Sequence, residues 1–370
     1  MANSIKTEEI GKLGFGYMRL PKINGELDVE QTNKMADTFL SNGGTYFDVA
    51  YVYDGAEVAL RETVIKRHPR DSFQVASKLP VSMVSKDKPM EHFLNTSLER
   101  IGTDYLDFYL LHGIDARGNK LCEDLGAWEY LAKLKDQGII RHMGFSFHGP
   151  ADDLDEILTK HPETEFTQLQ INYWDWDNPN VNGRRLYEIA TKHNVPIIIM
   201  EPLLGGKLAS KDSPIAELLH NANPKATIAS WALRFIAQLD GVFTTLSGMS
   251  TFEQLVDNLE TYADFKPLNK SELETIDKAV EILKSVPRIQ CTECDYCKDC
   301  PVNVPIPGLL NLYNSHLVHK TTTNLDGTYN WITNGKAKAN ECIACGVCEE
   351  ICPQRLEIVE LLGKISALFD

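Results

Sequence analysis

The stretch Thr45-Tyr-Phe-Asp-Val-Ala-Tyr-Val-Tyr-Asp-Gly55 begins with the pattern of a strand and ends as a polar loop. Its first residues are β-branched or aromatic, which favours a strand. The strand ends near Asp48, and Tyr53 follows five residues later. A tyrosine has an unperturbed pKa of about 10, so proton exchange with a carbonyl oxygen near neutral pH requires a neighbouring cation. If Tyr53 takes part in chemistry, the fold has to bring a cation beside it.

The next two predicted strands end in residues of suitable kinds. Phe73-Gln-Val-Ala-Ser-Lys78 ends in a lysine, and the apolar run Leu106-Asp-Phe-Tyr-Leu-Leu-His112 ends in a histidine. Taken singly, each residue has an ordinary explanation, such as a turn for an aspartate or core packing for a histidine. Four such residues at the ends of three consecutive strands are unlikely to occur by coincidence. We therefore expect one cluster of functional side chains: Asp48, Tyr53, Lys78 and His112.

Strand and helix patterns alternate through the first 250 residues or so. After a strand that begins at Leu13, strands are predicted at 44–48, 73–77, 105–111, 140–146, 166–172, 195–200 and 242–246. Helices are predicted at 29–42, 56–67, 90–101, 124–137, 151–160, 183–194 and 224–238. This alternation favours an α/β fold, a closed (β/α)₈ TIM barrel with its chemistry at the carboxyl ends of the strands. A doubly wound open sheet is the weaker alternative, because no G-x-G-x-x-G turn follows the first strand.

The order and spacing of these four residues resemble the catalytic tetrad of the aldo-keto reductases. The resemblance implies reduction of a carbonyl, or oxidation of an alcohol, by hydride transfer with NAD(H) or NADP(H). It makes Tyr53 the proton donor, with Lys78 and Asp48 tuning its acidity. It gives His112 the task of orienting the carbonyl oxygen. The substrate itself is not specified, because barrel specificity lies in the loops.

The resemblance also implies where the dinucleotide binds. Gly16 would allow close backbone approach, although a tight turn explains it equally well. Members of the family that select NADPH carry a lysine and an arginine where this chain has Gly248 and Gln254. Recognition of a 2′-phosphate is therefore not favoured, and NADH is as plausible a cofactor as NADPH. The remaining implied contacts are Ser146, Gln170, Met200, Glu201, Pro202, Leu203, Ser250 and Asn258.

Eight of the nine cysteines lie in the last 80 residues. The first run is Cys291-x₂-Cys294-x₂-Cys297-x₂-Cys300-Pro301, and the second is Cys342-x₂-Cys345-x₂-Cys348-x₃-Cys352-Pro353. In a protein without secretion signals, such spacing indicates metal or cluster ligation rather than disulfides. Zinc is the competing metal, but it usually takes two C-x-x-C pairs rather than two runs of four. The ninth cysteine, Cys122, is most simply a packing residue.

The second run matches the bacterial ferredoxin pattern, and the first has one residue fewer before its last cysteine. The resemblance implies two [4Fe-4S] clusters with crossed ligands. Cys291, Cys294, Cys297 and Cys352 would hold one cluster, and Cys342, Cys345, Cys348 and Cys300 the other. Helix patterns at 305–319 and 356–369 predict a mainly helical module, with 321–338 as a loop. We expect a barrel domain at 1–284 and a ferredoxin-type domain at 285–370.

The formal net charge of −15 argues against nucleic acid or an anionic membrane as a partner. Residues 1–6 lack the apolar segment of a signal peptide, and no apolar run approaches the length of a membrane span. We therefore expect a cytoplasmic protein.

Three functions fit this combination of domains. In the first, carbonyl chemistry in the barrel is coupled through the clusters to a one-electron carrier such as a ferredoxin or flavodoxin. Hydride transfer moves electrons in pairs and a cluster moves one, so coupling ordinarily requires a flavin or a redox-active substrate. No flavin motif stands out. In the second, the protein is a nicotinamide-dependent reductase, and the clusters only stabilise the fold of the small C-terminal domain. In the third, the chain is a nucleotide-binding redox sensor or electron-transfer subunit without enzymatic activity.

Overall fold

A computed structural model of the chain describes residues 5, 10–179, 181–319 and 325–370. The expectation about residues 1–6 falls largely outside this range. The chain divides into two compact units. The barrel unit comprises Met1–Leu203 and Asn223–Leu273, and the cysteine unit comprises Leu204–Ala222 and Glu274–Asp370. The cysteine unit thus includes a segment that lies between two barrel strands in the sequence.

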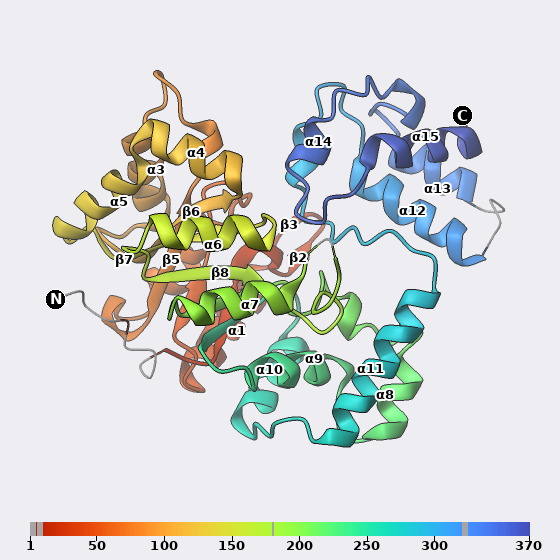
Figure 1. The fold of residues 1–370 in the computed structure, drawn as a ribbon, viewed down its shortest axis with the longest axis horizontal. Coiled ribbons are helices and arrows are strands. Elements are labelled where there is room, and N and C mark those ends of the chain that lie inside the picture. Colours follow the sequence, from red (N-terminus) through yellow and green to blue (C-terminus); the bar gives the residue numbers. More distant parts are fainter. Residues whose placement is uncertain (1–4, 6–9, 180, 320–324) are drawn as a thin grey trace. The chain divides into compact units, whose positions relative to one another are not determined.

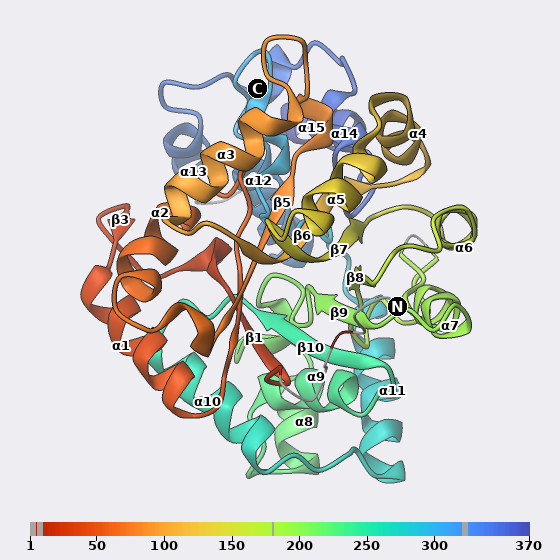
Figure 2. The same cartoon turned by 90° about the vertical axis from the view of Figure 1, so that its left-hand side faces the viewer.

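The barrel unit is built on eight parallel strands that close on themselves (Figures 1 and 2). Their order around the barrel is β1-β10-β9-β8-β7-β6-β5-β4, and β4 pairs with β1 to complete the ring. Closure confirms the predicted barrel and excludes the open doubly wound sheet. The strands are β1 Leu13–Gly16, β4 Tyr46–Asp48, β5 Gln74–Leu79, β6 Leu106–Ile114, β7 Ile140–Phe147, β8 Phe166–Gln170, β9 Ile197–Met200 and β10 Val242–Ser247. A separate two-stranded hairpin pairs β2 Lys22–Ile23 with β3 Glu26–Leu27.

Alternation along each strand separates the barrel interior from the layer under the helices. Phe108 of β6 lies in the buried interior cluster, with its ring centroid 5.1 Å from those of both Tyr46 and Phe166. Phe47, the next residue along β4, instead meets Phe39 of helix α1 at 5.2 Å between ring centroids. Each strand therefore presents every second residue to the interior.

Helices follow the strands around the barrel (Figure 2). Two predicted helices differ in detail. The pattern at 56–67 is α-helical only to Leu60 and continues as a π-helical turn at Arg61–Ile65. The pattern at 124–137 is wrong in extent, because Gly126, with φ of 69°, ends one helix and begins the next. The helices, including two that contribute to the cysteine unit, are α1 Val29–Ser41, α2 Ala56–Leu60, α3 Met90–Ile101, α4 Ala116–Leu125, α5 Ala127–Asp136, α6 Ala151–Lys160, α7 Gly183–Lys192, α8 Ala216–Ala222, α9 Ile228–Ala237, α10 Phe252–Ala263 and α11 Lys270–Ser285.

The cysteine unit is mainly helical, as predicted. Its C-terminal part contains α12 Ile306–His319, α13 Leu325–Ile332, α14 Val347–Glu350 and α15 Ile358–Phe369. The loop predicted at 321–338 is wrong over α13, while residues 321–324 lie outside the described range. Tyr329 explains the helix, because its buried ring stacks on Phe369 at 5.0 Å between centroids and its hydroxyl donates to Asp370. Tertiary packing thus overrides the polar composition of that stretch.

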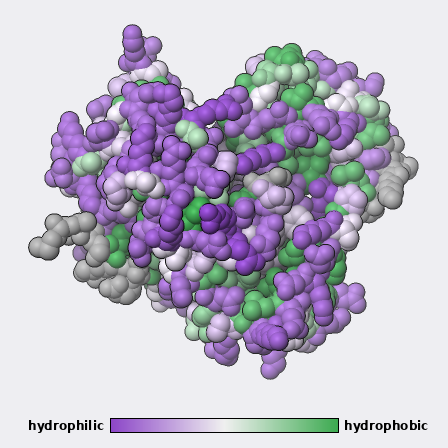
Figure 3. Space-filling view, in the orientation of Figure 1, coloured by the Kyte–Doolittle hydropathy of each residue, from purple (hydrophilic) through white to green (hydrophobic). Residues whose placement is uncertain are grey.

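The core of the cysteine unit is small, and cysteines form part of it. Cys291 and Cys348 belong to its buried apolar cluster, and four further cysteines pack against that cluster. Its exposed large apolar side chains include Trp331, Ile343, Val347 and Ile351, and Figure 3 shows apolar surface among the side chains of this unit. No helix in the described part of the chain is both long enough and apolar enough to span a membrane.

Candidate active site and cysteine centres

The alternation of the strands explains how three of the predicted catalytic residues reach one place. Tyr46, Ala76 and Phe108 belong to the interior cluster of the barrel. The residue two or four positions later on each strand shares the same face and lies nearer the carboxyl end. Those residues are Asp48 on β4, Lys78 on β5 and His112 on β6. The sequence pattern thus directs all three toward the inner carboxyl edge of neighbouring strands.

Asp48 and Lys78 form a buried ion pair. Lys78 Nζ lies 2.7 Å from Asp48 Oδ1 and donates a second hydrogen bond to the Val49 carbonyl at 2.8 Å. Burial lowers the pKa of Lys78 and raises that of Asp48, and their mutual attraction opposes both shifts. Asp48 Oδ2 has no hydrogen-bond partner. The pair therefore holds a cation at a fixed point inside the barrel.

Tyr53 lies in the loop after β4, within reach of this cation. Lys78 Nζ is 4.7 Å from the centroid of the Tyr53 ring, and the Tyr53 and His112 ring centroids are 5.8 Å apart. A turn positions the loop, because the Tyr53 amide donates to the Ala50 carbonyl at 3.0 Å. Burial, with the Lys78 cation as a second cause, holds the pKa of His112 well below its ordinary value. The structure thus brings all four side chains together, with His112 neutral near pH 7.

Two glutamines lie on the inner face of β8, one of which sequence reasoning did not select. Gln170 Nε2 donates to the buried Asp175 carboxylate at 2.8 Å. Gln168, two residues earlier on the same face, has Nε2 3.5 Å from Met200 Sδ, and its buried Oε1 has no hydrogen-bond partner. Gln168 therefore offers an open amide oxygen beside Met200. The sequence could have indicated Gln168, because it lies two residues from Gln170 and so on the same face of the strand.

The predicted dinucleotide residues gather where β1 meets β10. A Cβ atom on Gly16 would lie 3.5 Å from the Ser247 carbonyl oxygen, so the two strand ends are in contact. The Ser250 amide donates to Gln254 Oε1 at 2.8 Å, and Asn258 Nδ2 donates to Ser247 Oγ at 2.9 Å. These two side chains thus organise the loop before α10.

Arg19 is a cation that the sequence did not reveal at this position. A Cβ atom on Gly248 would lie 3.3 to 3.5 Å from Cβ, Cγ and Cδ of Arg19, so the arginine side chain lies across the glycine. The Arg19 carbonyl accepts from Ser250 Oγ at 2.6 Å, and its guanidinium is 4.0 Å from the Glu201 carboxylate. A positive charge therefore lies beside the position where the family lysine is missing, with Glu201 nearby to offset it.

The other implied cofactor residues lie on neighbouring strand ends. Ser146, buried on β7, accepts a hydrogen bond from the Gly113 amide at 2.9 Å. Met200 ends β9, and the loop begins at Glu201, whose φ of 53° lies in the left-handed region. The Glu201 carbonyl accepts from Asn172 Nδ2 at 3.0 Å. Pro202 and Leu203 continue this loop to the end of the barrel unit.

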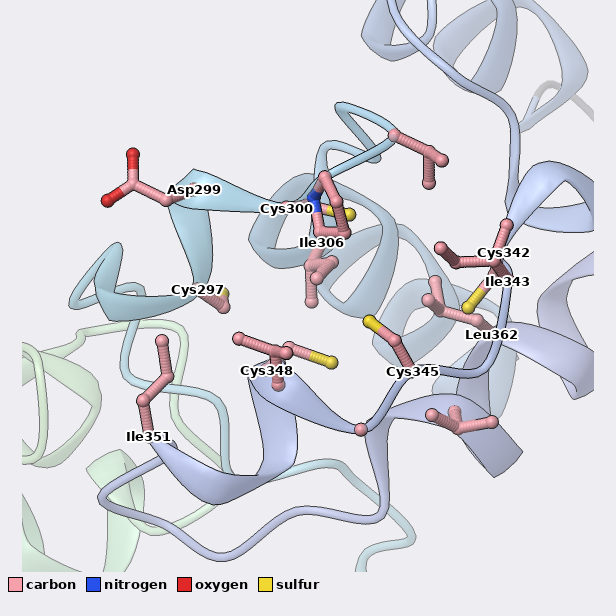
Figure 4. Close-up of a pocket in the computed structure, with 15 residues that line it drawn as sticks. Cys297, Asp299, Cys300, Ile306, Cys342, Ile343, Cys345, Cys348, Ile351 and Leu362 are labelled. Atoms are coloured by element: carbon pink, nitrogen blue, oxygen red, sulfur yellow. The ribbon is translucent and has the colours of Figure 1, made fainter.

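The eight cysteines of the two runs line two cavities in the cysteine unit. The first centre is the cavity lined by Cys291, Cys294, Cys297 and Cys352. The second centre is lined by Cys300, Cys342, Cys345 and Cys348, with Cys297 at its edge. Figure 4 shows the four sulfur atoms of the second centre directed toward a common space. Each run therefore contributes its last cysteine to the cavity of the other run.

The donor set of both cavities fits an iron–sulfur cluster. Apolar side chains surround the sulfur atoms, including Leu310 and Ile358 at the first centre and Ile306 and Leu362 at the second. Burial raises the pKa of Cys297 to about 12 and that of Cys348 to about 11, so a bound metal cation would be needed to hold these side chains as thiolates near neutral pH. A mononuclear zinc site needs several ligands around one ion. Within the described residues, no three or more His, Cys, Asp or Glu side chains are placed to hold a single metal ion. Ligands spread around a cavity suit the corners of a cubane better than a tetrahedral zinc site.

Comparison with known families agrees with both parts of this description. The aldo/keto reductase family model matches residues 12–281, and the 4Fe-4S dicluster domain model matches residues 290–357. The first match spans most of the chain, so the protein belongs to the aldo/keto reductase family. The family resemblance expected from the tetrad and the cysteine runs is confirmed, and the chain is an oxidoreductase of this family with a C-terminal 4Fe-4S domain.

Individual relatives share the barrel part. An aldo-keto reductase of Mycolicibacterium smegmatis is 28% identical over 263 residues, which cover 68% of this chain and 83% of the relative. Methylglyoxal reductase DkgB of Salmonella typhimurium is 28% identical over 200 residues, covering 53% of this chain and 71% of the relative. A solved aldo-keto reductase from Klebsiella pneumoniae in complex with NADPH shares the fold with a TM-score of 0.58 and 22% identity, covering 76% of this chain and 94% of that structure.

Proposed function

We propose that this protein reduces a small carbonyl compound, or oxidises the corresponding alcohol, and that two [4Fe-4S] clusters connect this reaction to a one-electron carrier. Tyr53 is the proton donor in the direction of reduction. Asp48 and Lys78 hold the cation beside it, and His112 orients the carbonyl oxygen. The observation that carries the proposal is the meeting of these four side chains at one edge of the barrel.

The physical argument starts from the Lys78 ammonium. A cation near a phenol favours loss of the phenolic proton, and a barrel interior of low polarity strengthens that effect. Lys78 is fully buried and its position is fixed by two hydrogen bonds, so its field at Tyr53 requires little reorganisation. A neutral His112 can donate one hydrogen bond to a carbonyl oxygen without adding a second charge.

The hydride donor is proposed to be NADH or NADPH. The NADPH complex of the Klebsiella pneumoniae relative supports a nicotinamide cofactor, and the name of the DkgB relative supports a small carbonyl such as methylglyoxal. We also propose that Gln168, which the sequence did not indicate, contacts the nicotinamide carboxamide in place of the predicted Gln170. Gln170 is engaged by Asp175, whereas Gln168 has an unpartnered Oε1.

The proposed coupling requires that the electrons consumed in the barrel match those supplied by the clusters. Reduction of a carbonyl to an alcohol consumes two electrons and two protons, and two clusters supply one electron each. Nicotinamide delivers both electrons as hydride, so direct coupling requires a group that splits a pair, such as a flavin in the dinucleotide site or a redox-active substrate. A reduced ferredoxin or flavodoxin is the partner class that would reload the clusters.

The test of the barrel chemistry is Tyr53→Phe, assayed anaerobically with methylglyoxal and each nicotinamide cofactor. Loss of a positioned proton donor lowers kcat by roughly 10²- to 10⁴-fold, while the dinucleotide Kd changes little. Tyr51→Phe is the matched control, because Tyr51 lies two residues away and packs against Phe93 and Arg100. Turnover by Tyr53→Phe at the rate of the control would contradict the assignment.

Two further functions remain as candidates. If the clusters are structural staples, nicotinamide-dependent turnover continues while the clusters stay in one oxidation state. If the chain is a sensor or electron-transfer subunit, it binds nucleotide and turns over no carbonyl. We further propose a cytoplasmic location and a boundary near residue 284 between the barrel and ferredoxin-type domains. The family matches, which end at 281 and resume at 290, are compatible with that boundary.

A further inference from the structure

The loop after β9 leads directly into the cysteine unit. Leu204, Gly205 and Gly206 all have φ between 49° and 89°, in the left-handed region. This conformation is unfavourable for a leucine, and Leu204 is nevertheless almost fully buried. The chain therefore accepts local strain to follow this path. The path ends in a short 3₁₀ turn, Lys207–Ala209.

Gly205 makes a close backbone contact with the first cysteine run. A Cβ atom at this position would lie 2.6 Å from the Thr292 carbonyl oxygen and 3.2 Å from Thr292 Cα. Real side chains do not occupy such positions, so only glycine permits the approach. Thr292 immediately follows Cys291, a ligand of the first centre. The loop segment is thus fitted against the backbone of that ligand.

Lys207 places a positive charge at the same point. Its ammonium donates a hydrogen bond to the carbonyl oxygen of Cys291. A fixed positive charge therefore lies next to a residue that lines the first centre.

Reduction adds one negative charge to a cluster and its thiolates, so a nearby fixed cation favours the reduced form. Net charge and hydrogen bonds around the ligands are the main means by which a protein sets cluster potentials. We propose that Lys207 is a positioning residue that raises the reduction potential of the first centre. The proposal relies on the [4Fe-4S] assignment of the proposed function, but not on carbonyl turnover.

Lys207 is also close in the sequence to the proposed dinucleotide contacts. Only Leu204, Gly205 and Gly206 separate Lys207 from the proposed dinucleotide residues ending at Leu203. The residue that tunes the first centre therefore belongs to the same loop as the cofactor contacts.

The experiment is an anaerobic redox titration of the holoprotein, followed by electron paramagnetic resonance without substrate or nucleotide. In Lys207→Met, the potential of one cluster falls and that of the other is unchanged. Lys207→Arg restores the shifted value, and Lys211→Met, an exposed lysine on the same segment, leaves both potentials as in the wild type. The shifted signal is assigned with Cys345→Ser, which alters the signature of the second centre only.

Gly205→Ala provides an independent variant, because an added Cβ displaces the segment that holds Lys207. It lowers the same potential as Lys207→Met. Unchanged potentials in Lys207→Met, equal shifts of both clusters, or the same shift in Lys211→Met would each overturn the proposal. A preparation without iron and sulfide would instead contradict the cluster assignment in the proposed function, so the two failures are distinguishable.

Discussion

The two units hold their reactive groups in different ways. In the barrel unit, the chain itself supplies the partners: Lys78 is neutralised by Asp48, and surrounding strands bury both side chains. In the cysteine unit, eight thiols line two cavities, only Cys291 and Cys348 among them are buried, and the core around them consists of short helices and loops. The polypeptide alone therefore brings the barrel site together, whereas the proposed clusters would be needed to connect the sulfur atoms of the cysteine unit.

The two units therefore differ in what stabilises their folded state. A barrel of eight paired strands buries a continuous interior without help. The cysteine unit resembles small scaffolds in which metal binding provides much of the folding free energy. Conditions that remove iron should therefore destabilise the cysteine unit and leave the barrel unit folded. Substitutions in the tetrad should lower the reaction rate and leave the cluster content unchanged.

Removal of the clusters is expected to have the largest effect. Treatment with a chelator and an oxidant should lower hydrogen-exchange protection in α12–α15 by at least about a thousandfold, or ~4 kcal/mol, and leave barrel strands β4–β8 protected. Mass spectrometry of exchanged peptides measures both regions in one sample. Equal loss of protection in the barrel strands would show that the two units do not differ in this way.

Crossed ligation of the two centres predicts the next largest effect. Cys352→Ala should disturb the cluster whose other ligands lie in the first run, because Cys352 lines that cavity. Cys300→Ala should disturb the cluster of the second run. Iron and sulfide analysis with spectroscopy of both variants measures this, and Cys122→Ala is a control outside the cysteine runs. Loss of the second-run cluster in Cys352→Ala would contradict the crossing.

Cofactor choice should show a smaller effect. The family cations are absent at Gly248 and Gln254, and Glu201 lies 4.0 Å from the guanidinium of the nearby Arg19. We therefore expect a preference for NADPH over NADH below about a hundredfold, or ~2.7 kcal/mol. Dissociation constants for both cofactors test this. A larger preference that disappears in Arg19→Met would identify Arg19 as the reader of the phosphate.

The pH dependence of barrel stability should show the smallest effect. His112 has a pKa well below its ordinary value of about 6.5, so below that pH the unfolded chain binds a proton that the folded chain does not. Stability from this group is complete above pH 6.5 and declines as the pH falls, by up to about 1.4 kcal/mol per pH unit. His112→Gln should decline less steeply between pH 6.5 and 5 in urea unfolding. An unchanged slope would contradict a neutral, buried His112.

The barrel was predictable because its signals repeat. Alternating apolar residues and strand-end polar residues recur in register, so the location of Asp48, Lys78 and His112 on three neighbouring strands could be predicted from the sequence. The helix at Leu325–Ile332 was not found, because its stability comes from contacts of Tyr329 with distant residues rather than from local composition. The same limit explains the missed break at Gly126, where a left-handed residue divides one expected helix into two.

The candidate site was only partly predictable for a related reason. Residues identified by spacing, such as the eight cysteines, occupy the expected cavities. Arg19, Gln168 and Lys207 contact residues far away in the sequence, and no local pattern indicates them. Lys207 in particular lies 84 positions from Cys291, and only the folded cysteine unit brings the two together.

The central claim, that barrel chemistry draws on the clusters, is tested by rapid freeze-quench paramagnetic resonance. Anaerobic protein with prereduced clusters, and with a flavin bound in the dinucleotide site as the group that pairs the electrons, is mixed with a carbonyl compound found to require Tyr53 for turnover. In the wild type, the reduced-cluster signal should disappear at the rate at which alcohol forms, with two cluster electrons lost per alcohol. In Tyr53→Phe, both processes should slow together. Persistence of the reduced signal through many nicotinamide-supported turnovers of the wild type would contradict the claim and make the clusters structural.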